Sequence, residues 1–357
     1  MLNNKRILFL DYLRTLAFIT VIIGHKYGVK LSELRTDETL HITLRQACEL
    51  IYSLCVSGAL GVIIFFMISG FIITYVIKTE NTTEFFIKRI FRIYPLYIFA
   101  LLCEAGYLFY FKNEATSLRT LFLQGLLIGD FFNVPTSLKN VEWTLRIEIL
   151  FYLIMGMLKT LKITKNGNVL IAVLLIITTL LWKSTPFPDS ASDHTGYVSA
   201  FAPFLFIGVV FYLIDSKAVN PTLSLLSILF MFYVHLDCVS NYILKLNNLS
   251  YGIYGLIIFT LSYFFKQKFP YNKKIITLSE ITYPVYLFHN WAWDPIKGMV
   301  TRINLPLIPT DMQIIIILLT FCYILNICIE KRANQFGRDI ANNITKRKRS
   351  LPPTRTI

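Results

Sequence analysis

The sequence has few charged residues and no closely spaced cysteine pairs. Only 16% of its 357 residues are charged, whereas 55% are hydrophobic, and the mean hydropathy is +0.58. A soluble domain would need far more polar surface, so the composition predicts a polytopic helical membrane protein. None of the six cysteines forms a C-x-x-C pair, so we expect neither a disulfide framework nor a metal site.

Hydrophobic runs of about membrane length predict an all-α bundle of about ten transmembrane helices. The run 47–77 is too long for one straight span and contains several glycines, so we expect it to be tilted or broken. The segment 119–132 is apolar but short, and we expect it to be re-entrant or interfacial. A polar loop is predicted at 28–46 and a basic amphipathic segment at 84–95. The predicted spans are 7–27, 47–77, 93–111, 142–158, 168–182, 197–214, 221–235, 249–266, 275–296 and 311–330.

The distribution of lysine and arginine predicts the orientation of this bundle. With the N-terminus in the cytoplasm, the cytoplasmic segments hold 22 of these residues and the outer segments 11. This bias predicts cytoplasmic N- and C-termini in the cell's inner (plasma) membrane. The net charge of +14 then reflects topology and contact with the lipid bilayer rather than nucleic-acid binding. We divide the chain into a membrane domain, 1–335, and a basic cytoplasmic tail, 336–357.

The first span carries three polar groups that a membrane helix normally avoids, namely Asp11, Arg14 and His25. These charges argue against a cleaved signal peptide. Asp11 and Arg14 are three residues apart, and Arg14 and His25 are separated by about three turns, or ~16 Å, along one face. Arg14 could simply snorkel to the interface with Asp11 as its partner. The presence of all three residues on one face of the helix instead favours a functional site.

Two later spans place further polar groups at a similar depth to His25. Glu148 is predicted ~8–10 Å below the outer surface, and Thr144 and Tyr152 share its helix face. His289 falls in the outer half of its span, where it could also be an interfacial aromatic-belt residue. Convergence of His25, Glu148 and His289 favours a site in which a histidine acts as general base or nucleophile.

A second polar cluster, Lys88, Arg89 and Arg92, is predicted on the cytoplasmic side. Arginine side chains bind phosphate well through paired N–H donors. Ordinary positive-inside charge is the alternative explanation. Together with Arg14, the cluster would form a basic path from the cytoplasm to His25 for a phosphate-bearing donor.

Five segments, in order, resemble the acyltransferase family 3 of integral-membrane O-acyltransferases. LDYLRTLAFITVIIGH resembles its first-helix signature, and GVIIFFMISGFIIT resembles its G-x-x-x-F-F-x-x-S-G-F pattern. KRIFRIYPLY resembles its R-x-x-R-I-x-P motif. EWTLRIEILFYL resembles its W-S-L-x-x-E-x-x-F-Y motif, with Thr144 in place of serine, and ITYPVYLFHN resembles its late motif, with Thr282 in place of serine.

The resemblance implies a membrane enzyme that moves an acyl group, usually acetyl, from cytoplasmic acyl-CoA to a hydroxyl of a cell-surface or exported sugar or polysaccharide. Acetyl-CoA would be a co-substrate, and no bound cofactor is implied. Polysaccharide synthesis or export machinery would be a possible partner. The implied residues are His25, Glu148, Arg14 and Asp11 for catalysis; Arg89, Arg92 and Lys88 for the donor; and Ser69, Trp143, Tyr286 and His289 as acceptor or supporting residues.

Several alternatives remain open at the level of sequence. His25 could accept the acyl group or could deprotonate the acceptor hydroxyl for direct attack. Arg146 could pair with Glu142 or contact an anionic acceptor. The chain ends soon after the last predicted span, so the membrane domain would complete transfer alone or hand over to a partner. A polyprenyl-sugar or polysaccharide transporter, and a non-catalytic partner of a synthase, are the rival functions.

Overall fold

The computed structural model describes residues 6–184, 186–189, 195–242, 250–303 and 307–350. For residues 346–350 it describes the backbone only. Helices joined by short turns make up this part of the chain, and no strand occurs in it, as the composition predicts. The helices are α1 (Leu8–Thr36), α2 (Ile42–Cys55), η1 (Val56–Gly58), α3 (Ala59–Ile77), α4 (Thr82–Lys112), α5 (Leu118–Gly125), η2 (Gly129–Phe132), α6 (Trp143–Thr160), η3 (Ile163–Lys165), α7 (Gly167–Lys183), α8 (Tyr197–Asp215), α9 (Pro221–Tyr242), α10 (Ser250–Phe264), η5 (Lys266–Lys268), α11 (Lys273–Glu280), α12 (Thr282–Phe288), α13 (Trp293–Ile303), α14 (Thr310–Leu325), the π-helix η6 (Asn326–Glu330) and α15 (Lys331–Ser350).

Several helices are suited to crossing a bilayer. Five stretches within the described ranges are long and apolar enough, namely Leu8–Thr36, Ile42–Ile77, Tyr197–Asp215, Pro221–Tyr242 and Thr310–Thr345. Two shorter apolar helices, Gly167–Lys183 and Ser250–Phe264, accompany them. The protein is therefore an all-helical, multi-pass membrane protein.

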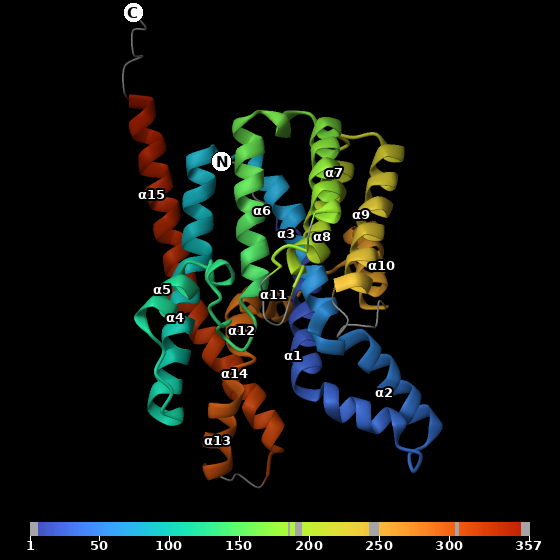
Figure 1. The fold of residues 1–357 in the computed structure, drawn as a ribbon, viewed down its shortest axis with the longest axis vertical. Coiled ribbons are helices and arrows are strands. Elements are labelled where there is room, and N and C mark those ends of the chain that lie inside the picture. The colour runs from blue at the N-terminus through green and yellow to red at the C-terminus, as the bar shows by residue number, and fades with distance from the viewer. Residues whose placement is uncertain (1–5, 185, 190–194, 243–249, 304–306, 351–357) are drawn as a thin grey trace, which may run out of the picture.

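The bundle is built around α3 and α8 (Figure 1). Every residue of α8 from Tyr197 to Leu213 is buried, and the apolar α3 packs along it. The close crossing requires Gly70, because an added Cβ there would overlap the Leu205 carbonyl. Two helical hairpins, α1–α2 and α13–α14, project from the lower end of the bundle in Figure 1.

The predicted loop at 28–46 is wrong over most of its length. Helix α1 continues to Thr36 and α2 begins at Ile42, because 29–36 contains neither glycine nor proline to stop the helix. The predicted break in the run 47–77 is confirmed. It lies at Ser57 and Gly58, whose φ angles are 50° and 68°.

The predicted amphipathic segment 84–95 and the span 93–111 form one continuous helix, α4. Its N-terminus is fixed by a capping box between Asn81 and Glu84, and it passes through Pro95 without ending. The segment 119–132 contains the eight-residue α5 and the short η2. At ~1.5 Å per residue, α5 is too short to cross the hydrocarbon core.

The predicted span 275–296 is not one helix but three short helices. The chain turns at Ile281 and again over 289–292. Pro284 and Pro295 each lie in the first turn of the following helix, where a missing N–H is tolerated. By contrast, α14, η6 and α15 run on without interruption, so the predicted domain boundary at 335/336 falls inside α15. Residues 351–357 of the predicted tail lie outside the described part.

Candidate active site

A large chamber, lined by both charged and apolar side chains, lies inside the apolar bundle. Its volume is about 940 Å³, and its walls come from α1, α3, α4, α6, α11, α12, η6 and α15. Exposed side chains at one end, including Arg6, Lys331 and Arg338, mark where it opens. Pockets of several hundred Å³ hold cofactor-sized ligands, so the chamber has room for a ligand of that size.

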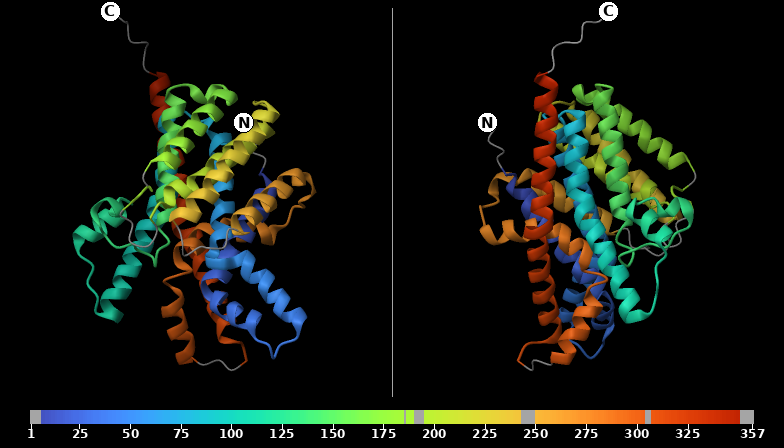
Figure 2. Two further views of the ribbon diagram at one scale, coloured as in Figure 1. Left: turned by 45° about the vertical axis from the view of Figure 1, so that its right-hand side comes forward. Right: turned by 90° about the vertical axis from the view of Figure 1, so that its left-hand side faces the viewer.

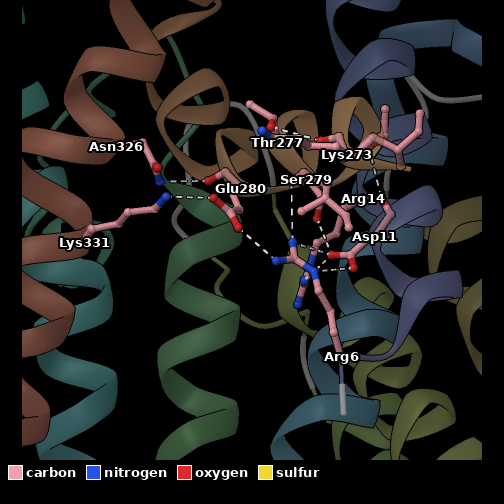
Figure 3. A network of polar contacts seen from close by, with 12 residues as sticks. Arg6, Asp11, Arg14, Lys273, Thr277, Ser279, Glu280, Asn326 and Lys331 are labelled. Atoms are coloured by element: carbon pink, nitrogen blue, oxygen red, sulfur yellow. Dashed lines mark hydrogen bonds and ion pairs between the residues drawn. The ribbon is translucent and has the colours of Figure 1, made fainter. Parts of the chain in front are cut away.

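Asp11 anchors two cationic side chains at the chamber's open end, Arg6 just before α1 and Arg14 within it (Figure 3). It is 1% exposed and accepts hydrogen bonds from Arg6 Nε (2.7 Å), Arg6 Nη2 (3.2 Å) and Ser279 Oγ (2.7 Å). Arg14 Nη1 lies 3.5 Å from the same carboxylate. Fourteen residues, or ~21 Å of helix, separate Asp11 from His25. Asp11 here positions Arg6 and Arg14, and the catalytic role expected for it stays a prediction.

Glu280 joins four helical elements at the chamber mouth (Figure 3). Its carboxylate accepts from Arg6 Nη1 and from Lys331 Nζ, each at 2.8 Å. Its backbone carbonyl accepts from Asn326 Nδ2 at 2.9 Å. Asn326 begins the π-helix η6, and π-turns of this kind occur often at functional sites. These bonds hold α1, α11, η6 and α15 together around the opening.

The three basic residues predicted to bind a donor differ in their surroundings. Lys88 is held by Glu80 (3.1 Å) and Glu84 (2.5 Å) and does not line the chamber, and its contact with a donor stays a prediction. Arg89 lines the chamber but is paired with Glu80 at 3.1 Å. Arg92 also lines it, and no carboxylate in the described ranges pairs with it.

Glu148 lies on the chamber wall on the same face of α6 as Thr144 and Tyr152, as predicted. Its Oε1 accepts hydrogen bonds from Ser69 Oγ at 2.9 Å and from the Tyr152 hydroxyl. Deeper in the chamber, the Thr144 and Tyr286 hydroxyls are 2.6 Å apart. Within the described residues Glu148 makes no hydrogen bond to either histidine of the predicted site.

His25 and His289 come together from α1 and the end of α12, with ring centroids 5.2 Å apart. His289 is 1% exposed, and its Nδ1–H donates to the Tyr286 carbonyl at 2.8 Å. This bond leaves the lone pair on Nε2, which has no partner in the described part of the chain. His25 is exposed. The arrangement places one accessible and one oriented, buried imidazole side by side.

The break between α2 and α3 supports His25 from the other side. An added Cβ on Gly58 would lie 3.3 Å from His25 Nε2, and one on Gly24 would overlap the Cys55 carbonyl and the Gly58 nitrogen. Gly24 and Gly58 therefore allow the backbones of α1 and η1 to meet beside the imidazole. Tyr286, one turn before His289, lines the deep end of the chamber. The histidine pair thus lies just beyond that end.

Trp143 and Arg146 support the site without lining it. The Trp143 ring packs between Tyr197 and Phe201, with centroids 5.7 and 5.1 Å away. Arg146 is 4% exposed and forms ion pairs with Glu142 and Asp130. The predicted Glu142 pair is therefore present, and the alternative contact with an anionic acceptor is excluded by burial.

Other polar residues of the chamber went unpredicted. Asn326 and Glu330 lie on η6, and Asn326 Nδ2 donates to Glu330 Oε2 at 2.8 Å. Both are polar residues at the end of an apolar run, which is a signal that could have identified them. Arg338 had no such signal, because it lies in a polar segment that resembles an ordinary basic tail.

Comparison with known proteins adds a family match to this geometry. The family described as an acyltransferase domain (acyltransferase family 3) matches residues 7–328. The putative acetyltransferase ORF330 of Acidianus two-tailed virus is 25% identical over 244 residues, covering 65% of this chain and 72% of the viral protein. No solved structure matches the chain.

Two further relatives carry O-acetyltransferase names. The peptidoglycan O-acetyltransferase OatA of Listeria monocytogenes is 27% identical over 179 residues, covering 44% of this chain and 28% of OatA. The O-acetyl transferase of Shigella phage Sf6 is 24% identical over 184 residues, covering 48% of this chain and 50% of the phage protein. The aligned regions therefore span half or less of these two relatives.

Proposed function

The chain belongs to the acyltransferase family 3, and we propose that it is a membrane O-acetyltransferase that transfers acetyl from cytoplasmic acetyl-CoA to a hydroxyl of a cell-surface or exported glycan. The observation that carries the proposal is the basic chamber that ends beside the His25–His289 pair. The names of OatA and of the phage O-acetyl transferase support acetyl as the acyl group.

We propose that the chain crosses the plasma membrane ten times, with both termini in the cytoplasm. The helices α11, α12 and α13 together make the ninth crossing, and α14 with α15 makes the tenth. Lysine and arginine are more abundant in the segments on the same side of the bundle as the two termini, which supports this orientation. The chamber mouth then faces the cytoplasm, where acyl-CoA is made.

In this orientation the chamber receives the donor. Arg92 and Arg14 bind the diphosphate, because these two cations line the chamber and lack the close carboxylate pairs that hold Lys88 and Arg89. The uncharged pantetheine arm extends past Ser69 and Glu148 toward Thr144 and Tyr286. The thioester is thereby brought to the histidine pair, while the acceptor reaches exposed His25 from the outer side.

The histidine pair supplies the proton transfer. An imidazole nitrogen takes the proton of the acceptor hydroxyl as the oxygen attacks the thioester carbonyl, and the imidazolium then returns it to the departing CoA thiolate. His25 is the base because it is accessible, and His289 supports it. Glu148 contributes from the chamber wall, where it accepts hydrogen bonds from Ser69 and Tyr152. No bound cofactor takes part. The acceptor comes from the machinery that synthesises or exports the glycan.

The test is transfer from radiolabelled acetyl-CoA by the purified protein in detergent, with and without added glycan. We expect His25→Ala to abolish transfer while the protein stays folded. His41→Asn is the matched control, because His41 caps α2 and asparagine is also a good N-cap. Normal transfer by His25→Ala would refute the catalytic role. A folded wild-type protein that neither binds nor turns over acetyl-CoA would refute the proposed donor.

A further inference from the structure

One wall of the chamber lies beyond the region that the family match covers. The match ends at residue 328, whereas Lys331, Asn334, Gln335 and Arg338 of α15 also line the chamber. Their spacing of three or four residues places all four on one helix face. The segment that the sequence presents as a basic tail is therefore part of the wall.

The position of this wall follows from how α15 packs against α4 (Figure 2). The rings of Phe336 and Phe91 lie 5.4 Å apart, and Asn81 Nδ2 donates to Thr345 Oγ1 at 3.1 Å. The two helices therefore run antiparallel, with Phe336 beside Phe91 and Thr345 beside Asn81. Arg338 consequently lies at the level of Arg89, about one turn closer to the chamber mouth than Arg92.

Among the cations at the mouth, Arg338 has no acidic partner in the described part of the chain. Arg89 is paired with Glu80, and Lys331 with Glu280. Arg338 is exposed, and its Nε and Nη2 donate to Gln335 Oε1 at 3.2 and 2.8 Å. These bonds orient the guanidinium, and Gln335 Nε2 in turn donates to Asp339 Oδ1 at 2.9 Å. Arg338 itself forms no ion pair among the described residues, and its Nη1 makes no hydrogen bond there. Such a group is suited to binding a phosphate.

We propose that Arg338, oriented by Gln335, binds the 3′-phosphate of the CoA donor. The inference rests on the proposed function, because it follows from the order of groups along CoA. With the thioester at the deep end and the diphosphate at Arg92 and Arg14, the adenosine 3′-phosphate is the charged group closest to the mouth. Arg338 is the cation that α15 places at that level.

The test compares binding of acetyl-CoA and 3′-dephospho-acetyl-CoA to the purified full-length protein. We expect the wild-type protein to bind acetyl-CoA about tenfold more tightly than the dephospho analogue, as one charge-assisted contact implies. Arg338→Ala should bind both probes equally, with the affinity that the wild-type protein has for the analogue. Arg332→Ala is the control, because Arg332 is an exposed arginine of the same helix that does not line the chamber.

The outcomes separate this inference from the proposed function. If the wild-type protein binds acetyl-CoA but Arg338→Ala keeps the wild-type preference for the 3′-phosphate, the inference is overturned and the donor stands. Equal binding of the two probes by the wild-type protein would also overturn the inference and leave the proposed donor in place. If the wild-type protein binds neither probe, the proposed donor fails and the inference fails with it.

Discussion

The contact between α1 and the break before α3 allows the role of His25 to be tested without changing a polar residue. Gly24 directly precedes His25, and an added Cβ there would overlap the Cys55 carbonyl and the Gly58 nitrogen and lie 3.0 Å from Gly58 Cα. These are backbone atoms, so no side-chain rotation relieves the overlap. Gly24→Ala must therefore push α1 and η1 apart by about 1 Å, which shifts the imidazole.

Gly24→Ala is expected to lower both the rate of transfer and the stability of the fold. A misplacement of about 1 Å at a reacting group lowers rates by about 100-fold, or ~2.7 kcal/mol of transition-state stabilisation. Overpacking costs ~1–3 kcal/mol of folding free energy. The donor chamber lies toward the other end of α1, so we expect the affinity for acetyl-CoA to stay at the wild-type value.

The assay measures kcat for acetyl transfer, the Kd of acetyl-CoA and the melting temperature in detergent. Gly28→Ala is the matched control, because Gly28 is one turn further along α1 with nothing within 4 Å of an added Cβ. It should retain activity and gain ~1 kcal/mol in stability from helix propensity. A folded Gly24→Ala protein with wild-type kcat would refute the reasoning, as would an equal loss in Gly28→Ala.

Three further predictions concern the polar network. Glu148→Gln should lower initial transfer rates about 100-fold with little change in acetyl-CoA affinity, because the amide oxygen still accepts from Ser69 and Tyr152 but lacks the charge; unchanged rates would exclude a role for the carboxylate. Asp11→Asn should weaken acetyl-CoA binding in a calorimetric titration, since Arg14 loses its anchor; wild-type affinity would contradict this. Arg146→Met should lower stability by ~3–5 kcal/mol, because it leaves buried carboxylates unpaired. The exposed Lys139 pair should contribute less than ~1 kcal/mol, so a Lys139→Met protein that melts as low as Arg146→Met would refute the burial argument.

The sequence predicts the helix faces of the site well, because the spacing of polar residues in an apolar helix determines which of them share a face. Thr144, Glu148 and Tyr152 do line one wall. Helices α6, α7, α8 and α10 begin and end close to the predicted spans, whereas α9 begins as predicted but continues to Tyr242, beyond the predicted end at 235. The pairing of Arg146 with Glu142 also follows from their i, i+4 spacing. Such local predictions need no knowledge of how the helices pack.

Contacts between distant segments could not be predicted in this way. Hydropathy detects apolar length, so it predicts one helix over 275–296, although the chain turns twice within this run. The same measure read 28–46 as a loop, because polar composition resembles a turn even where no residue stops the helix. Glu148 was expected beside His25 from equal depth alone, whereas packing brings it to Ser69 and Tyr152.

The division of polar groups between the two ends of the chamber bears on how two substrates from opposite sides of a membrane could meet. The cations lie at the mouth, and several of them are already neutralised by Glu80, Glu280 and Asp11. Charge that remained unpaired along the whole path would conduct small anions through the bundle. Beyond Glu148 the wall carries the Thr144 and Tyr286 hydroxyls and leads to the imidazoles of His25 and His289, beside which Asn290 holds Lys26. In the proposed mechanism the uncharged acyl arm therefore enters this part of the chamber, while the phosphates stay with the cations at the mouth.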